Sequence, residues 1–287
     1  MFPREFDYTA PTTLDEALQI LAGNPGAKVM SGGMSLIPLM KLRLFSPQLV
    51  VDIGRIGGLD SIGDAGDHVT IGALVRHAQT ASDPLVAANA AALAQAAAWT
   101  GDVQVRNRGT TCGALAHADI AADQPAGALA CGATMVAKSA TGTREIPAED
   151  FFVDMLTSAL NPDEILVEVR LPKSGAGEGS AYDKLGRRGG HTDYAVAGAA
   201  AWVRKTNGTV EAARVAITGV GSRPTIATGV ADAIVGTDGS AAAVSAAAAH
   251  ALEGVTVLED LYGSEEYKAH LATVFTARAL TGALAAT

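Results

Sequence analysis

The sequence feature that most constrains the fold is a pair of adjacent glycines directly after a short apolar run. The segment reads Val29-Met30-Ser31-Gly32-Gly33-Met34-Ser35-Leu36-Ile37-Pro38. We interpret its first residues as the end of a buried strand and its last residues as a short helix. Glycine has no Cβ, so another molecule can approach the peptide N–H groups closely. Such N–H groups before a helix suit an anion such as a pyrophosphate; a tight turn without a ligand is the alternative.

The segments on either side of this turn predict a compact α/β lobe. Thr13 and Glu16 have the spacing of a capping box and precede an amphipathic helix. The predicted order is strand 5–8, helix 14–23, strand 27–30, helix 36–44 and strand 48–53.

A second glycine turn lies in the run Arg106-Asn107-Arg108-Gly109-Thr110-Thr111-Cys112-Gly113-Ala114. Small residues here would let a cofactor lie against the backbone, and Asp119 and Asp123 follow as acceptors for ribityl or ribose hydroxyls. The alternative is that Asp123 caps a helix over 124–130 and that Asp119 is a loop residue. His117 lies near both carboxylates, but no other ligand has a matching spacing, so we expect no metal site.

The rest of the chain predicts a second lobe and a C-terminal α+β domain. A linker-like stretch, 173–180, contains three glycines and separates the second lobe from the C-terminal domain. The second lobe is predicted to contain one helix over 82–99, a hairpin over 135–147 and a strand over 164–171. The C-terminal part is predicted to contain strands over 181–185, 194–205 and 211–219 and helices over 225–235, 240–252 and 265–284.

Composition excludes several classes of function. The 287 residues carry a formal net charge of −9, which argues against nucleic-acid binding. No apolar run is long enough to span a membrane, and the N-terminus does not have a signal-peptide pattern. Two cysteines form neither a disulfide framework nor a CxxC pair. We expect a cytoplasmic protein that could associate with a membrane only through partners.

The two glycine turns together resemble segments of the FAD-binding medium subunit of molybdenum hydroxylases, the family of carbon monoxide dehydrogenase and xanthine dehydrogenase. Residues 31–38 resemble its A-G-G-x-S/T-L-I/L-P segment, and residues 106–114 its R-N-R-G-T-I/L-G-G-N/S turn. Residues 118–123, 163–166 and 182–184 resemble three further motifs of that family, in the same order. The resemblance covers essentially the whole chain.

The resemblance implies an α+β fold. An N-terminal two-lobed FAD-binding domain of the p-cresol methylhydroxylase type would be followed by a C-terminal α+β domain of antiparallel strands and helices. We expect the first domain at residues 1–175, with lobes at 1–55 and 56–175, and the second at residues 176–287.

The resemblance also implies an electron-transfer subunit. Its FAD would receive electrons from [2Fe–2S] clusters of a small subunit and pass them to an acceptor such as a quinone. A large subunit would hold the molybdenum cofactor, and two heterotrimers would form a dimer. One alternative is a self-sufficient FAD oxidase or reductase, with His117 or His191 as its acid–base group. Another is a flavin-free assembly module.

By position, the two turns would hold the pyrophosphate and the ribityl chain. Asp123 would face ribityl or adenosine hydroxyls, and Leu166 and Lys184 would lie near the isoalloxazine. Lys184 would stabilise a reduced, anionic flavin, and Tyr194 would cover one face of the ring. No catalytic residue is assigned. The expected FAD-binding residues are Val29, Met30, Ser31, Gly32, Gly33, Met34, Ser35, Leu36, Gly109, Thr110, Thr111, Cys112, Gly113, Ala114, His117, Asp119, Asp123, Leu160, Leu166, Lys184 and Tyr194.

Three residues depart from the family pattern. Met34 stands where many relatives have His or Gln, Cys112 replaces a glycine, and Ala114 replaces Asn or Ser. A cysteine restricts φ, so the second turn must take a negative φ there or carry strain. We therefore expect FAD to bind through backbone N–H donors, but less tightly than in relatives.

Overall fold

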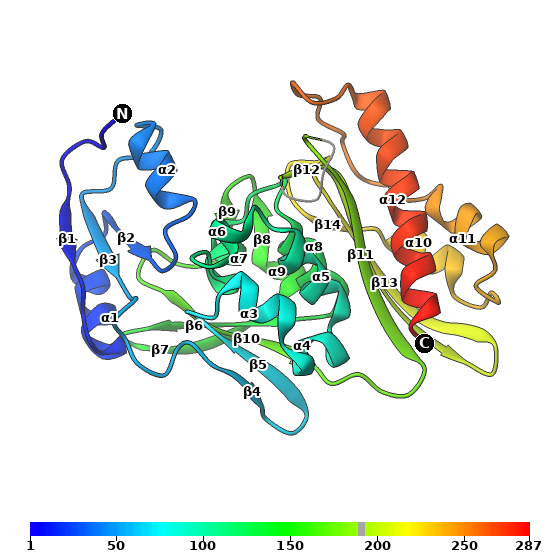
Figure 1. Cartoon of the computed structure of the whole chain (residues 1–287), viewed down its shortest axis with the longest axis horizontal. Helices are drawn as coiled ribbons and strands as arrows, with labels where there is room; N and C mark the ends of the chain where they lie inside the picture. Colours follow the sequence, from blue (N-terminus) through cyan, green and yellow to red (C-terminus); the bar gives the residue numbers. More distant parts are fainter. Residues whose placement is uncertain (189–192) are drawn as a thin grey trace.

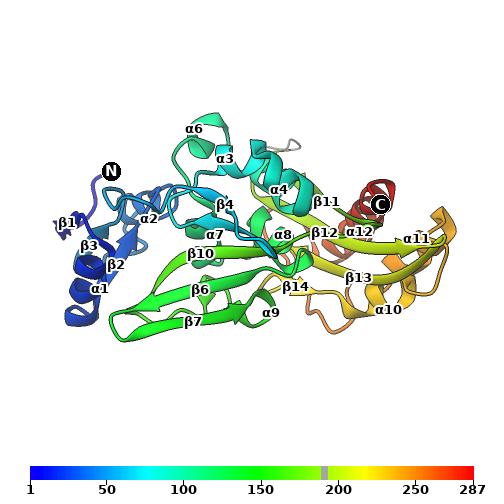
Figure 2. The same ribbon diagram turned by 90° about the horizontal axis from the view of Figure 1, so that it is seen from below.

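The computed structural model describes residues 1–188 and 193–287. These residues form three larger sheets and a two-stranded one, with helices packed between and beside them. Figures 1 and 2 show the sheets following one another along the long axis of the molecule in the order of the sequence. Among the described residues, no helix has the length and hydropathy needed to cross a membrane.

The N-terminal lobe is a parallel three-stranded sheet with two helices. Its elements are β1 (Asp7–Thr9), α1 (Leu14–Gly23), β2 (Ala27–Met30), α2 (Leu36–Lys41) and β3 (Leu49–Asp52), with strand order β1-β3-β2. The Thr13 side chain accepts a hydrogen bond from Glu16 N–H at 3.2 Å, as the sequence predicts for the start of α1. The Glu16 carboxylate reaches Thr12 N–H instead of the cap residue itself. The predicted element order of this lobe is confirmed.

The middle lobe is an antiparallel sheet with helices over one face. Its strands are β4 (Ile62–Asp64), β5 (His68–Gly72), β10 (Ile165–Pro172), β6 (Thr134–Ser139) and β7 (Gly142–Pro147), in that spatial order. Its helices are α3 (His77–Ser82), α4 (Pro84–Asn89), α5 (Ala91–Trp99), α6 (Val103–Arg106), α7 (Thr111–His117), α8 (Asp123–Ala130) and α9 (Ala148–Phe151). A small hairpin, β8 (Phe152–Asp154) with β9 (Thr157–Ser158), completes it.

The prediction of one helix over 82–99 is wrong, because α3, α4 and α5 are separate. Asp83 lies before Pro84, where helical ψ is disfavoured, and has ψ 126°. The second interruption follows Asn89, whose carbonyl oxygen accepts a hydrogen bond from the Ser174 hydroxyl at 2.9 Å. Asn89 Oδ1 also accepts from Ser174 N–H, so the linker-like stretch 173–180 is hydrogen-bonded to the point where α4 ends and α5 begins.

The C-terminal part is an antiparallel sheet between two helical layers. It contains β11 (Glu178–Gly186), β12 (Ala195–Thr206), β13 (Thr209–Thr218), β14 (Thr225–Ile226), α10 (Thr228–Ile234), α11 (Ala241–Ala248) and α12 (Glu265–Ala285). Ala200 and Ala216 belong to the core shared with the middle lobe, whereas Ala199 and Ala201 belong to the core under α12. Small side chains on both faces let α5 and α8 pack on one side and α12 on the other.

Candidate functional site

The two glycine turns predicted from the sequence lie against each other. Ser31 Oγ and Thr110 Oγ1 are 2.8 Å apart, although 79 residues separate them in the chain. A Cβ on Gly32 would collide with the carbonyl oxygen of Arg108 and lie 2.7 Å from Cα of Gly109. Because these are backbone atoms, a side chain at Gly32 would force the turns apart.

Two further glycines are required here for different reasons. A Cβ on Gly113 would lie 2.6 Å from Thr110 Oγ1 and 2.9 Å from Ser31 Oγ. Gly33 instead has φ +73°, which side chains rarely allow. We call the segments 31–35 and 109–114 together the double-turn cradle.

Each turn of the cradle leads into a helix. Ser35 is the N-cap of α2, and Thr110 is the N-cap of α7, where its hydroxyl accepts from Gly113 N–H at 3.2 Å. The first N–H groups of a helix have no acceptor within it, and they form its positive end. Neither helix has an acidic residue in its first turn. Thr111 N–H donates to the Val75 carbonyl and Ile37 N–H to the Gly33 carbonyl, so it is the remaining N–H groups at these two positive helix ends that suit an anion such as a diphosphate.

Cys112 lies in the first turn of α7 and has no positive φ. Of the two conformations that the sequence left open, the negative-φ one is therefore present. The side chain is buried and its thiol donates to the Ile71 carbonyl at 3.6 Å. Ala114 is partly buried in the same helix. Met34, in the first glycine turn of the cradle, is 36% exposed. Cys112 therefore gives no reason to expect strain in the cradle.

A buried polar network that the sequence did not predict supports the second turn. His77 N–H donates to the Gly109 carbonyl at 3.0 Å, and the His77 ring lies against the Cα of Gly109. Gln124 Nε2 lies 2.8 Å from His77 Nδ1 and donates to Thr100 Oγ1 at 3.1 Å. The Thr100 hydroxyl donates its own proton to the Ala96 carbonyl, so it can only accept from the Gln124 amide N–H. That amide nitrogen therefore also donates to His77 Nδ1, and the proton of the neutral His77 ring is on Nε2. An isolated histidine and glutamine carry no motif from which this could be predicted.

Asp123 is at the centre of a second buried cluster. Its carboxylate accepts from Tyr182 Oη at 2.6 Å and from Lys184 Nζ at 2.7 Å. Burial raises the pKa of Asp123 to about 6, although Lys184 and Tyr182 favour its ionised form. The alternative that Asp123 caps a helix is wrong: Ala122 is the N-cap of α8, without a side-chain hydrogen bond.

Tyr194 extends from the C-terminal part towards the first turn. Burial and the nearby Asp119 carboxylate raise the pKa of its hydroxyl, while a hydrogen bond with the Ser35 side chain acts in the opposite direction. Asp119 Oδ1 accepts from Ala121 N–H at 2.9 Å, which makes it a loop residue with an Asx turn. The cradle, Asp119 and Tyr194 are thus brought together from three parts of the chain.

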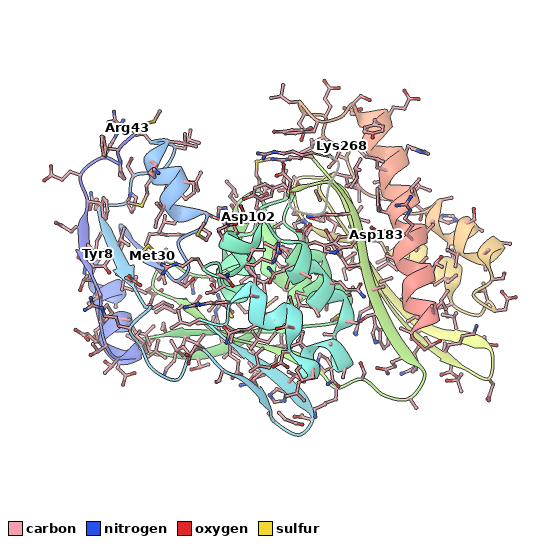
Figure 3. The ribbon with its side chains drawn as sticks, in the orientation of Figure 1. Tyr8, Met30, Arg43, Asp102, Asp183 and Lys268 are labelled. Carbon is pink, nitrogen blue, oxygen red and sulfur yellow. The ribbon has the colours of Figure 1, made fainter. Side chains whose placement is uncertain are left out.

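The remaining expected residues lie around this centre. Met30 is at the end of β2, on the side that faces the middle lobe (Figure 3). Leu166 is on β10 in the core of the middle lobe, 4% exposed, and Leu160 packs partly buried against that core. His117 ends α7, and burial lowers its pKa. His191 lies outside the described residues; within them, no three His, Cys, Asp or Glu could hold a metal ion.

Comparison with known proteins shows to which family the chain belongs. Residues 4–174 match the FAD binding domain in molybdopterin dehydrogenase, and residues 180–283 match the CO dehydrogenase flavoprotein C-terminal domain. The chain belongs to the FAD-binding medium-subunit family of molybdenum hydroxylases. Its members are oxidoreductase subunits.

Two relatives in this family are similar to the chain over almost their full length. The carbon monoxide dehydrogenase medium chain of Hydrogenophaga pseudoflava is 39% identical over 287 residues, which cover 99% of both chains. The alpha subunit of the 6-hydroxypseudooxynicotine dehydrogenase complex of Paenarthrobacter nicotinovorans is 37% identical, covering 99% of this chain and 96% of the relative. Solved structures of the Hydrogenophaga enzyme lacking its Mo-pyranopterin moiety and of quinoline 2-oxidoreductase from Pseudomonas putida 86 match with TM-scores of 0.95 and 0.92. These structures are 40% and 34% identical, and each match covers 99% of both chains.

The described residues fit the FAD of this medium-subunit family. The double-turn cradle has glycines at the places where a Cβ would separate its turns, and two helix starts that favour an anion. Asp119 and Ser35 lie near Tyr194, an aromatic side chain that is 40% exposed. Anion donors, a carboxylate and an accessible ring are the groups that a flavin dinucleotide needs.

The buried histidine under the cradle predicts a pH dependence. Burial, aided by Arg106, lowers the pKa of His77 from 6.5 to about 4. A lowered folded-state pKa gives stability that is present above pH 6.5 and is lost as the pH falls towards 4. We expect the neutral His77 to contribute about 3 kcal/mol to the unfolding free energy at pH 7 relative to acid.

Urea unfolding of the wild type and of His77→Gln at pH 7 and pH 4.5 measures this contribution. The stability gap between the two proteins should shrink at the lower pH. Asp123, whose folded-state pKa is raised, works in the opposite direction in both proteins and cancels in the comparison. A gap that is the same at both pH values would contradict the assignment.

Proposed function

We propose that the chain is the FAD-containing electron-transfer subunit of a heterotrimeric molybdenum hydroxylase. It would receive electrons from [2Fe–2S] clusters of a small iron–sulfur subunit and pass them to an external acceptor such as a quinone. A large subunit would hold the molybdenum cofactor, and two cytoplasmic heterotrimers would form a dimer. The observation that carries the proposal is the double-turn cradle, where Ser31, directly after β2, lies against Thr110, the N-cap of α7.

The role of each part of the chain follows from its chemistry. The peptide N–H groups of the double-turn cradle that have no acceptor in the protein would hold the pyrophosphate, and Asp119 would accept hydrogen bonds from cofactor hydroxyls. Tyr194 would cover the ring and exclude water from it. A bound flavin supplies the acceptance and release of electrons. We extend the proposal to the other expected FAD-binding residues except Lys184, which is treated below, and to a domain boundary between residues 175 and 176.

Two features favour an electron-transfer subunit over a self-sufficient enzyme. A [2Fe–2S] cluster needs four ligands, whereas the sequence has only Cys112 and Cys131, both buried. Burial raises the pKa of Cys131 to about 11, so it stays a neutral thiol. In the proposed complex the clusters would therefore lie on another chain. Of the two candidate acid–base groups, His117 is partly buried and its pKa is lowered.

Purification of the tagged chain from its own cells tests the proposal. We expect one FAD per chain, together with a larger molybdenum-containing chain and a smaller iron–sulfur chain. Substrate added to the complex should bleach the flavin absorbance, whereas substrate added to the chain alone should not. A chain that copurifies with no partner and turns over a substrate by itself would contradict the proposal.

A further inference from the structure

Lys184 is an ammonium group buried completely inside the protein. Its side chain has 0% relative exposure and comes from β11. Nζ donates to Asp123 Oδ2 at 2.7 Å, to the Asp193 carbonyl at 2.5 Å and to the Trp99 carbonyl at 3.2 Å. An ammonium has three N–H donors, and these three acceptors occupy all of them. None is left for a flavin atom.

The three acceptors come from separate parts of the fold. Trp99 ends α5 and Asp123 begins α8, both in the segment that matches the FAD-binding domain. Asp193 instead directly precedes Tyr194, at the entry to β12. Lys184 therefore ties the residue before Tyr194 to the ends of two helices in the other domain. A fixed carbonyl at position 193 restricts where the next side chain can lie.

Tyr194 is held from several sides by groups that depend on this position. Its N–H donates to Asp193 Oδ1 at 2.8 Å, and its carbonyl accepts from Arg187 N–H at 2.9 Å. The Arg187 guanidinium lies 5.1 Å from the Tyr194 ring centroid and 4.6 Å from that of Tyr262. The hydroxyl of Tyr194 lies near Ser35 in the cradle. These contacts restrict the orientation of the Tyr194 ring across the site.

We infer that Lys184 is a positioning residue for Tyr194, acting through the Asp193 carbonyl, and does not itself touch the flavin. This inference rests on the proposed function, because it takes the cradle to hold FAD. It changes the role that the resemblance implies for Lys184, from a charge beside the flavin to a buried anchor. The charge of Lys184 is matched inside the protein by Asp123.

A double-mutant cycle on the full chain tests the inference. Lys184→Met, Tyr194→Leu and the double variant are compared with the wild type by FAD dissociation constant, flavin fluorescence and flavin reduction potential. Lys184→Met and Tyr194→Leu should each raise the fluorescence and weaken FAD binding. If Lys184 acts through Tyr194, adding Lys184→Met to Tyr194→Leu should change the dissociation constant by less than about twofold. The flavin reduction potential of the double variant should also equal that of Tyr194→Leu.

Two variants serve as controls. Tyr182→Phe removes the other hydrogen bond to Asp123 but leaves the Lys184–Asp193 contact, so it should preserve the wild-type flavin fluorescence. Lys184→Met leaves a buried carboxylate unpaired, so the cycle is repeated with Asp123→Asn added to every Lys184→Met protein. That background retains an acceptor for Tyr182 and has no unpaired charge.

The outcomes separate this inference from the proposed function. A further loss of affinity of about tenfold or more, or a further change in reduction potential, when Lys184→Met is added to Tyr194→Leu would overturn the inference alone. A wild-type chain that takes up no FAD would overturn both. Non-additive variants of a flavin-binding chain support both.

Discussion

Replacing Gly32 by alanine is expected to weaken FAD binding by about 30-fold, which corresponds to roughly 2 kcal/mol. The new Cβ would meet the carbonyl oxygen of Arg108 and the Cα of Gly109, which are backbone atoms that no rotamer change can move away. Ser31 and Thr110 would lose their 2.8 Å contact as the turns separate. Turns that have moved apart cannot both donate to one pyrophosphate. Equilibrium titration of the flavin-free chain with FAD, read by flavin fluorescence, gives the dissociation constant.

A matched substitution controls for the loss of a glycine as such. Gly57 has open space where its Cβ would lie and no positive φ, so Gly57→Ala should bind FAD like the wild type. Replacing both Gly32 and Gly33 by valine should give a chain that is folded, by circular dichroism, but free of flavin. Retention of FAD by that double variant would contradict the cradle assignment.

Replacing Lys184 by methionine should lower the unfolding free energy by about 3–5 kcal/mol, the usual cost of breaking a buried ion pair. Asp123 is 3% exposed and would keep its hydrogen bond from Tyr182 but lose the cation that balances it. The carbonyls of Trp99 and Asp193 would lose a donor as well. Urea unfolding at pH 7 measures the loss.

Removing both charges should restore much of that stability. In Asp123→Asn combined with Lys184→Met no buried charge remains, and the amide oxygen still accepts from Tyr182. The double variant should therefore be more stable than Lys184→Met alone. If it were less stable by the sum of the two single effects, Asp123 and Lys184 would not be energetically coupled.

Local signals in the sequence predicted much of the fold. The Thr13 cap and the strand before the first glycine turn each depend on residues close together in the chain. The cradle was predicted as two separate turns. The resemblance implied that both bind one cofactor, but only the fold shows their contact, since no local rule brings Ser31 to Thr110 across 79 residues.

The parts that were not predicted depend on distant partners. The break after Asn89 is stabilised by Ser174, 85 residues further along the chain. Lys184 was expected beside the flavin because of the resemblance, and only the fold reveals its buried acceptors. His77 was missed for the same reason, since its partner Gln124 is 47 residues away.

The central claim is that the double-turn cradle holds the pyrophosphate of FAD. The most direct measurement compares the affinities of the flavin-free chain for FAD and for riboflavin, which lacks the pyrophosphate, in the wild type and in Gly32→Ala. We predict that the wild type binds one FAD per chain, about 100-fold or more tighter than riboflavin, and that Gly32→Ala removes most of this preference. Equal affinity for both flavins, or an unchanged preference in Gly32→Ala, would contradict the account.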